Sequence, residues 1–447
     1  MNRRLHDVAC TVCGCVCDDL SITVQDNQII AVEGACELAR PWFLAQNTCQ
    51  SPMAQIGGQS VPLDAALDHA GTILAAAQSP LIFGLSRSTT EGQRAAVALA
   101  DLIQATIDTS ASTGHAPSIM ALQEVGESTC TLGEVRNRAD LVIFWGADPL
   151  RTHPRHVERY LPRAIDRTYP KDHPERCIVV VDDHATESAQ AADCFLAIPS
   201  ECHWEALWVL RMLLQGREPA DEALAGLPDG FPMAGLRELS AQMSHCRMGI
   251  IFFGSKLAET RLAHRTVEAL LQLVTDLNRH TRFYARRLRR YGDVAGADSV
   301  LTWQTGYPFG VNFFAGFPRY NPGEFTGPEM LARGEVDACV ILGSETAQDL
   351  PDAAKIHLRK IPVILLDPPG AEPIVPATVL FTTAVYGVHR PGTAYRMDEV
   401  AIPLRTMLTS DYPSDGEVLN ALSDRLSGIP DSGKRTRLTE PGYLNQE

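Results

Sequence analysis

The stretch Leu141-Val-Ile-Phe-Trp-Gly146 is a run of five apolar residues that ends in a glycine. Five other short apolar runs have the same character, and a segment with helical spacing of its apolar residues, 90–105, follows the first of them. These runs are 81–84, 178–181, 249–254, 340–343 and 363–366. Continuous apolar strands that alternate with helical segments are typical of parallel sheets covered by helices on both faces. The pattern therefore predicts an α/β fold.

The sequence also contains a weak internal repeat. The segment 139–146, with the letters ADLVIFWG, resembles 336–343, with the letters VDACVILG. Each copy is followed by another apolar strand that ends in an aspartate, Asp182 or Asp367. Two doubly wound halves that face each other would explain the repeat. The alternative is that all strands of α/β proteins look alike.

Ligands of doubly wound sheets bind beyond the carboxyl ends of the strands. Gly146 and Gly343 end strands, where a backbone without a side chain can approach a phosphate closely. Asp182 and Asp367 end the next strands, where a carboxylate commonly accepts hydrogen bonds from ribose or guanine. The alternative for each aspartate is a cap on the following helix.

The composition is that of a globular protein, with 447 residues and a formal net charge of −15. An acidic chain without a basic stripe is a poor nucleic-acid binder. No apolar run approaches the ~18 residues of a membrane span, and the first residues lack the apolar core of a secretory signal. We therefore expect a cytoplasmic protein. One short basic cluster fits a local anionic ligand; it comprises Arg282, Arg286, Arg287, Arg289 and Arg290.

Six of the 12 cysteines lie in the first 49 residues. Because cytosolic thiols stay reduced, such clustering indicates metal ligands rather than disulfides. The spacing C-x2-C-x3-C, with a fourth cysteine after eighteen intervening residues, favours a [4Fe-4S] cluster. Structural zinc, the alternative, tends to use two C-x2-C pairs. The expected ligands are Cys10, Cys13, Cys17 and Cys36, with Cys49 as the alternative fourth, and Cys15 is expected to point away from the site.

These patterns divide the chain into four parts. Residues 1–55 are expected to form an iron–sulfur domain around a small hairpin, with strands at 20–24 and 29–33. Residues 56–130 and 320–425 form the first α/β domain, and residues 131–319 form the second. The rest, 426–447, is a polar tail.

Several long segments resemble the B subunit of formylmethanofuran dehydrogenase. The resemblance extends from about residue 8 to about residue 405. The segments that carry it are 10–20, 35–36, 121–126, 130–140, 142–149, 153–156, 301–309, 318–324, 383–387 and 390–398. That family belongs to the molybdenum and tungsten oxidoreductases with two pyranopterin guanine dinucleotides.

The resemblance implies a [4Fe-4S] domain followed by two α/β domains that clamp the two dinucleotides. It also implies that the C-terminal barrel of larger relatives is a separate subunit, which fits a chain ending soon after residue 405. The resemblance and the strand-end rule together assign cofactor binding to Gly146, Asp148, Asp182, Thr186, Gly343, Asp367 and Thr393. The pair His153 and His156 has metal-ligand spacing, but we expect it in a loop near phosphate or a partner subunit.

One position departs from the family pattern. The family places a cysteine or selenocysteine metal ligand directly before a histidine, and here the matching residues are Gly114 and His115. The active-site arginine of the family aligns with Arg289. The resemblance thus assigns acid–base and anion-binding roles to His115 and Arg289, whereas Gly114 cannot ligate a metal.

Three functions are compatible with these residues. The first is a redox-silent B subunit of a bacterial formyltransferase/hydrolase complex in tetrahydromethanopterin-linked C1 metabolism, with a zinc amidohydrolase-like sister subunit. The second is an active tungsten or molybdenum subunit that interconverts CO2 and formate, with an oxygen ligand replacing the thiolate. The third is an electron-transfer or structural iron–sulfur module without a substrate. The missing thiolate favours the first.

Overall fold

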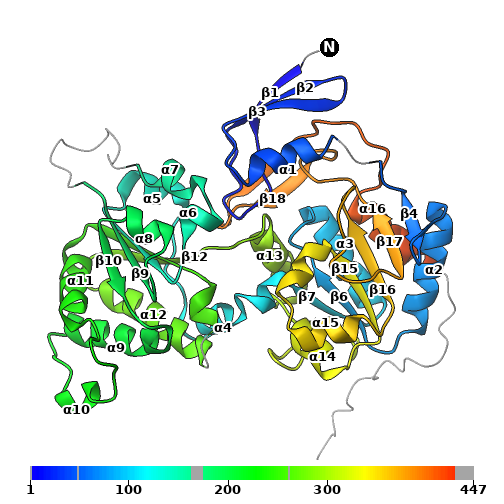
Figure 1. Ribbon diagram of the computed structural model, residues 1–447. Coiled ribbons are helices and arrows are strands. Elements are labelled where there is room, and N and C mark those ends of the chain that lie inside the picture. The colour runs from blue at the N-terminus through cyan, green and yellow to red at the C-terminus, as the bar shows by residue number, and fades with distance from the viewer. Residues whose placement is uncertain (1–2, 48–49, 163–174, 260–261, 428–447) are drawn as a thin grey trace, which may run out of the picture.

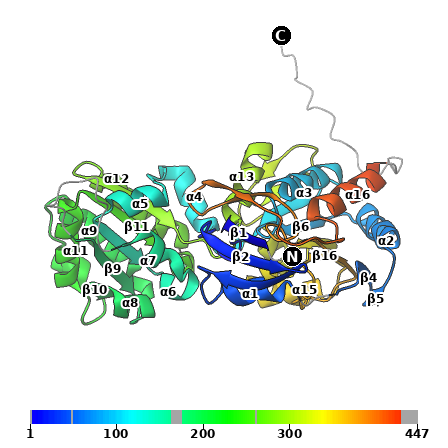
Figure 2. The same cartoon turned by 90° about the horizontal axis from the view of Figure 1, so that it is seen from above.

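The computed structural model describes residues 3–47, 50–162, 175–259 and 262–427, and the structural statements below refer to these residues. Two α/β bodies lie side by side, and a small three-stranded sheet from the N-terminal segment lies above and between them (Figures 1 and 2). Among the described residues, no helix has the length and apolar character needed to span a membrane.

The smaller body is built on five parallel strands in the order β10-β9-β8-β11-β12. The first strand in sequence, β8, is central, so the connections leave it in opposite directions and the order changes direction between β8 and β11. This is the doubly wound topology, and its ligand crevice lies at that point. The strands are β8 (Leu141–Trp145), β9 (Cys177–Asp182), β10 (Cys194–Ala197), β11 (Met248–Phe253) and β12 (Arg282–Arg287).

Both faces of this sheet are covered, as the continuous apolar strands predict. Ile143 and Ile251 pack on one face against helices between residues 203 and 277, whereas Phe144 and Phe252 face the opposite side and the N-terminal segment. The helices of this body are α4 (Ala116–Val125), α5 (Leu132–Arg138), α6 (Pro149–Thr152), α7 (Arg155–Tyr160), α8 (Glu187–Ala191), α9 (His203–Leu214), α10 (Asp221–Leu224), α11 (Met233–His245) and α12 (Ala263–Leu277).

The larger body has a nine-stranded sheet in the order β14-β13-β7-β6-β15-β16-β17-β4-β5. Its five central strands are parallel, and short antiparallel strands extend both edges, so the sheet is mixed rather than purely parallel. The order changes direction between β6 and β15. The strands are β4 (Ala54–Ile56), β5 (Gln59–Ser60), β6 (Pro80–Gly84), β7 (Thr106–Thr109), β13 (Val311–Asn312), β14 (Arg319–Tyr320), β15 (Ala338–Leu342), β16 (Val363–Asp367) and β17 (Val379–Thr382).

Helices cover both faces of the larger sheet as well. One face packs against α2, α3, α13 and α16, and the other against α14 and α15. The antiparallel strands β13 and β14 take residues 311–320 into this sheet, across the expected domain boundary at 319. The helices are α2 (Leu63–Ala76), α3 (Thr90–Leu102), α13 (Val294–Thr305), α14 (Gly327–Arg333), α15 (Asp352–Leu358) and α16 (Asp415–Ser427).

The N-terminal sheet has the order β1-β2-β3 and is antiparallel. The sequence indicated its hairpin but not β1, whose residues are largely exposed and charged. Its core is continuous with the smaller body. The remaining elements are β1 (Arg3–Val8), β2 (Leu20–Gln25), β3 (Gln28–Glu33), α1 (Ala39–Ala45) and a hairpin of β18 (Gly392–Tyr395) and β19 (Ala401–Leu404). Residues 428–447 of the expected tail lie outside the described residues.

Candidate functional site

A tight loop between β1 and β2 carries three of the four expected cluster ligands. We call residues 10–19 the cysteine loop. The Cys10 amide donates to the Cys17 carbonyl over 2.8 Å, and the Val16 amide donates to the Cys13 carbonyl over 3.1 Å. These bonds close the loop on itself, so Cys10, Cys13 and Cys17 are buried together. Cys36 follows β3 and is half-buried.

The cysteine set fits an iron–sulfur cluster better than a single zinc ion. Burial and the nearby Cys13, Cys17 and Cys36 raise the pKa of Cys10, so the four thiols are mutual neighbours. A tetrahedral zinc site would bring its sulfurs within about 3.8 Å of one another. Within the described part of the chain, no three cysteine sulfurs lie within 4.8 Å of one another. Cys49, the alternative fourth ligand, lies outside the described residues.

Cys15, which was expected to point away from the site, is buried, and its Sγ atom lies 3.8 Å from Nδ1 of His156. The neighbouring thiols of Cys13 and Cys17, together with burial, raise the pKa of Cys15. Val16 takes a positive φ of 35° where the loop folds back. The neighbouring Cys15 thiol and Arg159 lower the pKa of Cys17 to about 7, although burial opposes the shift. The lowered pKa favours the thiolate of Cys17, which is the form that binds a metal.

Helix α7 fastens the cysteine loop to the smaller body. Arg155 donates two hydrogen bonds, of 2.7 and 2.8 Å, to the carboxylate of Asp19. Arg159 donates to Asp18 over 2.7 Å. His156 lies between these arginines and faces the loop. The helix therefore fixes where the cluster ligands lie relative to the smaller sheet.

A cavity of about 580 Å³ opens at the point where the order of the smaller sheet changes direction. We call it the Gly114 cavity. Gly146 ends β8 with φ +57°, and a Cβ there would lie 2.8 Å from Leu257. Gly254 ends β11, and a Cβ there would lie 2.3 Å from the Gly146 carbonyl oxygen. Only glycine fits at these two positions. Because no side chain stands there, a phosphate can approach the backbone closely.

The predicted residues of the smaller body meet in the Gly114 cavity, which Gly146, Asp148, Asp182 and Thr186 all line. The Asp148 carboxylate accepts a 3.1 Å hydrogen bond from the Ser188 amide, where α8 begins. Thr186 caps α8. Thr186, and not Asp182, is therefore the residue that caps the following helix.

Asp182 carries a buried, unused acceptor. Its Oδ1 atom accepts a hydrogen bond of 2.5 Å from Lys256 Nζ, whereas its Oδ2 atom has no hydrogen-bond partner among the described residues. Burial raises the pKa of this carboxyl despite the lysine. A buried carboxylate oxygen without a donor costs free energy unless a ligand supplies one. It fits the N–H or O–H donors of a nucleotide. Lys256, which the strand patterns had not indicated, follows another strand-ending glycine, Gly254.

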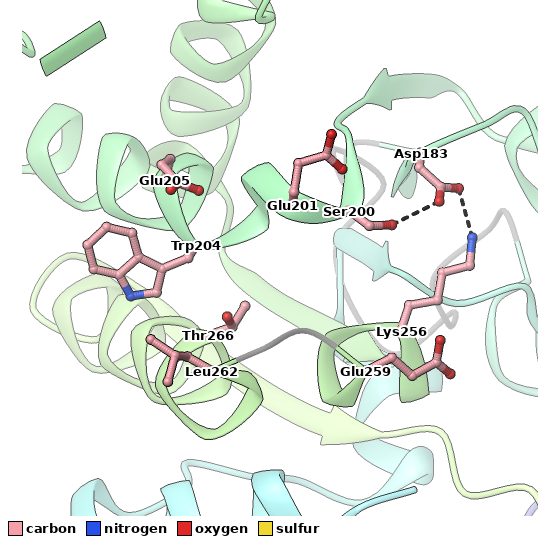
Figure 3. Close-up of a pocket in the computed structure, with 9 residues that line it drawn as sticks. All are labelled: Asp183, Ser200, Glu201, Trp204, Glu205, Lys256, Glu259, Leu262 and Thr266. Carbon is pink, nitrogen blue, oxygen red and sulfur yellow. Dashed lines mark hydrogen bonds and ion pairs between the residues drawn. The ribbon is translucent and has the colours of Figure 1, made fainter. Parts of the chain in front are cut away.

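A second cavity of about 820 Å³ lies next to the first. We call it the Trp204 cavity. Lys256 and Glu259 line both cavities, and Lys256 forms an ion pair of 2.9 Å with Asp183 (Figure 3). Ser200 also donates to Asp183 over 2.8 Å. Trp204 gives the far wall an aromatic surface, and the glutamates on the lining make it acidic, so the cavity suits a planar ligand with hydrogen-bond donors.

The larger body repeats the arrangement of the smaller one. The Gly343 amide donates to the Leu366 carbonyl over 2.9 Å, as the Gly146 amide does to Val181 over 2.8 Å. Gly343 also has a positive φ, of 75°. This equivalence favours the two-halves explanation of the internal repeat.

Gly343 and Asp367 line a cavity of about 230 Å³ together with Arg87. Asp367 Oδ1 accepts from the Ser344 amide over 2.6 Å, whereas its buried Oδ2 has no hydrogen-bond partner among the described residues. Both halves thus present one unused carboxylate oxygen beside a strand-ending glycine. Thr393, in β18, lines neither this cavity nor the Gly114 cavity.

Gly114 lies where the chain crosses between the bodies, after β7 and before α4. Its φ of −137° is accessible to any residue, and a Cβ would meet no described atom within 4 Å. Gly114 faces the cavity beside His115. Packing and backbone strain therefore do not require a glycine here.

His115 is buried among cations. Burial and the charges of Arg289 and other arginines hold its pKa well below the usual range, so its imidazole is neutral. The buried Arg289 side chain is ion-paired with Asp298, and Asp298 accepts a 2.8 Å hydrogen bond from Thr109. Arg289 is thus held behind the cavity wall, and its neighbour Arg290 lines the cavity. The predicted His115 and Arg289 lie close enough to act on each other electrostatically.

His153 and His156 are not arranged as a metal pair. The Nε2 of His153 donates to the Arg289 carbonyl over 2.7 Å. His156 packs edge-on against Phe252, with ring centroids 4.7 Å apart. Both imidazoles are buried, and burial lowers their pKa values to about 4 and about 3, respectively. They are core histidines that position loops.

Comparisons with known proteins give a consistent family. No protein-family model matches the sequence. The chain is 36% identical over 433 residues to the B subunit of the tungsten-containing formylmethanofuran dehydrogenase 2 of Methanocaldococcus jannaschii, covering 94% of this chain and 98% of the relative. It is 34% identical over 427 residues to the corresponding subunit of Methanococcus maripaludis, covering 93% and 97%. The B subunit of the formyltransferase/hydrolase complex of Methylorubrum extorquens is 24% identical over 305 residues, covering 65% and 74%.

Two solved structures share the fold. The formyltransferase/hydrolase complex of Methylorubrum extorquens, in complex with methylofuran, contains a chain that aligns with a TM-score of 0.68 at 23% identity, covering 84% of this chain and 98% of that one. Acetylene hydratase of Pelobacter acetylenicus aligns with a TM-score of 0.67 at 11% identity, covering 94% and 69%.

Proposed function

The chain belongs to the family of formylmethanofuran dehydrogenase B subunits, and from this premise we propose that it is the redox-silent B subunit of a formyltransferase/hydrolase-type complex in tetrahydromethanopterin-linked C1 metabolism. The observation that carries the proposal is Gly114. The backbone there accepts any residue and the space around it is open. The fold would therefore admit a cysteine at this position, and the absence of the thiolate is not a structural requirement.

The proposal assigns the cofactors of the family to specific residues. Gly146, Gly254 and the neighbouring Lys256 would hold the phosphates of one pterin dinucleotide, and Asp182 Oδ2 would accept from its nucleoside. Gly343 and Asp367 would serve the second dinucleotide in the larger body. The orphaned buried oxygens of both aspartates support this assignment. Bound between the bodies, such a dinucleotide pair would carry tungsten or molybdenum and supply two-electron redox chemistry.

The N-terminal segment would hold a [4Fe-4S] cluster. Its proposed ligands are Cys10, Cys13, Cys17 and Cys36, and their mutual proximity without zinc-type spacing supports the assignment. A reduced cluster needs a compartment with reducing thiol chemistry, so the proposed location is the cytoplasm.

His115 has no proton to move in this proposal. Its imidazole is neutral and could accept a proton, but Gly114 offers no metal ligand beside it. A thiolate is a strong, soft donor that suits these metals. Its loss should weaken metal retention and remove the redox step, which leaves the hydrolysis of formylated furan to a zinc amidohydrolase-like sister protein. We propose that protein as a partner of this chain.

A second candidate is an active tungsten or molybdenum subunit that interconverts CO2 and formate. Two observations favour it. The chain is 36% identical to a tungsten-containing relative over nearly its whole length, against 24% over 305 residues to the relative from the hydrolase complex. The buried Arg289–Asp298 pair beside His115 is also intact. In this case an oxygen ligand would replace the thiolate.

Anaerobic purification of the native complex, followed by metal and pterin analysis, separates the two candidates. Iron near four per chain with little tungsten or molybdenum supports the first, and stoichiometric tungsten or molybdenum supports the second. A His115→Ala variant tests the silent role directly. Hydrolysis of formylated furan by the complex should stay nearly unchanged, and a loss of ~100-fold or more, typical of a working acid or base, would contradict the proposal.

A further inference from the structure

The larger body has a counterpart of Lys256, and it is Arg87. At the point where the strand order changes direction, β6 lies beside β15 as β11 lies beside β8. A Cβ at Gly84, which ends β6, would lie 2.5 Å from the Leu342 carbonyl oxygen, so this strand end approaches its neighbour as closely as Gly254 does. Lys256 follows Gly254 by two residues, and Arg87 follows Gly84 by three. Each half of the molecule therefore places a long cationic side chain at its ligand crevice.

The turn that carries Arg87 has a strained backbone. Leu85 is buried and takes a positive φ of 72°, which a bulky residue rarely adopts. Strain of this kind persists only where the surrounding structure holds it, and it is concentrated at functional sites. The turn sets Arg87 against the strand-ending Gly343, where a Cβ would lie 3.0 Å from both Cβ and Cγ of the arginine. Arg87 thus lines the cavity of about 230 Å³, which we call the Arg87 cavity.

Arg87 differs from Lys256 in its partners. Lys256 bonds the aspartate that ends the next strand, whereas the Nε of Arg87 bonds the carboxylate of Glu345. The Nη1 of Arg87 donates to the carbonyl oxygens of Thr11 and Val12 over 2.7 and 3.1 Å, and both residues belong to the cysteine loop. One side chain therefore lines the Arg87 cavity and also holds the cysteine loop.

The N-terminal segment forms part of the same cavity wall. Trp42 and Gln46 of α1 line the Arg87 cavity together with Asp367, whose buried Oδ2 has no hydrogen-bond partner among the described residues. A ligand in this cavity would therefore contact the N-terminal segment and the larger body at once. The bonds to Glu345 and to the loop use Nε and Nη1 of Arg87, so its Nη2 group can donate to an anion.

An anion bound at Nη2 would fix the guanidinium, and a fixed guanidinium holds the loop carbonyls more firmly. Coupling of this kind is reciprocal. We propose that Arg87 is a positioning residue through which a phosphate group in the Arg87 cavity and the cysteine loop stabilise each other. The inference rests on the proposed second dinucleotide, whose phosphate would be the anion. Lys256 bonds Asp182 and Asp183 of the smaller body, which makes it the matched comparison.

The test is amide hydrogen exchange of the cysteine loop, measured by mass spectrometry in the anaerobically purified complex, together with the pterin dinucleotide content of the same samples. In Arg87→Ala, loop exchange should be about tenfold faster, the size expected for one lost charge-assisted hydrogen bond, and the dinucleotide content should fall. Arg87→Lys keeps the charge but lacks the planar fork. It should retain more dinucleotide than Arg87→Ala, with loop exchange still fast.

Two further variants make the result specific. Lys256→Ala should lose dinucleotide while the cysteine loop exchanges as in the wild type. Arg94→Ala, which removes an exposed arginine of α3, should match the wild type in both measurements. Exchange of β11 in each variant reports whether the sheet remains folded.

Unchanged loop exchange in Arg87→Ala would overturn the inference. Fast loop exchange with a wild-type dinucleotide content would overturn it too, because Arg87 would then support the loop independently of the ligand. A wild type without pterin would instead refute the dinucleotide assignment. Inorganic diphosphate would then be the probe: it should slow loop exchange in the wild type but not in Arg87→Ala, and an equal response of the two would overturn the coupling.

Discussion

The Nε2 atom of His153 donates a hydrogen bond of 2.7 Å to the backbone oxygen of Arg289. A Cβ atom at Gly14 would lie 2.3 Å from the same oxygen. Three segments distant in sequence therefore meet at one carbonyl: the cysteine loop, the turn before α7 and the segment after β12. That last segment continues into Arg290 and Tyr291, which line the Gly114 cavity. The cysteine loop and the wall of the Gly114 cavity therefore meet at the carbonyl oxygen of Arg289.

Gly14→Ala should destabilise the protein. The added methyl group meets backbone rather than a flexible side chain, so the loop or the Arg289 segment must move. Overpacking of this kind costs about 1–3 kcal/mol. Denaturant unfolding measures the effect, with Gly226→Ala as control because a Cβ at Gly226 meets no described atom within 4 Å. Equal stability of the two variants would contradict the close approach.

His153 should make the protein sensitive to acid. Burial lowers its pKa to about 4 from the usual 6.5. Between pH 4 and pH 6.5 the unfolded chain therefore binds more protons at His153 than the folded chain does. The contribution of the neutral imidazole to the free energy of unfolding is complete above pH 6.5 and is lost as the pH falls toward 4. The slope from one histidine is at most about 1.4 kcal/mol per pH unit. His153→Gln, which can still donate to Arg289, should flatten the pH dependence of unfolding in this window. An unchanged slope would argue against a buried neutral imidazole.

Arg155 should be needed to keep the cysteine loop on the smaller body. Its two hydrogen bonds to Asp19 bind loop and helix together. Asp19 is partly exposed, so solvent screening limits the loss in Arg155→Ala to about 1 kcal/mol. We expect lower stability and faster loss of iron to a chelator. Arg237→Ala, which removes an exposed ion pair with Glu218, should behave as wild type, and identical iron release in the two variants would refute the role.

Gly114→Cys should fold normally and retain more metal. The φ of −137° and the open space admit the side chain without strain, and its sulfur would face the cavity beside His115. Elemental analysis of tungsten and molybdenum after gel filtration measures the gain. Gly114→Ala, which adds a Cβ without sulfur, is the control. If neither variant retains more metal than the wild type, the dinucleotide assignment of the Gly114 cavity loses its support.

Much of this arrangement could be read from the sequence, because it depends on local patterns. Runs such as 141–146 and 363–366 are apolar throughout, which marks strands covered on both faces. The strand-ending Gly146 and Asp182 could be identified because doubly wound sheets place ligands at that edge. The same rule applied to 249–254 would also have found Gly254 and Lys256.

Other features depend on contacts between distant segments. β12 carries arginines at positions where a buried strand would show apolar residues, and their partners, such as Glu127 for Arg287, lie elsewhere in the chain. The fold of the cysteine loop depends on the positive φ of Val16, which its β-branched side chain disfavours and the loop imposes. The edge strands β4, β5, β13 and β14 are too short to give a periodic signal.

The most direct test of the account is formate oxidation with a viologen acceptor by the anaerobically purified wild-type complex, assayed together with hydrolysis of formylated furan. We expect no formate oxidation and sustained hydrolysis, because Gly114 supplies no thiolate where the family places one. Robust viologen-linked formate oxidation by the wild type would contradict the redox-silent role and establish the active tungsten or molybdenum subunit in its place.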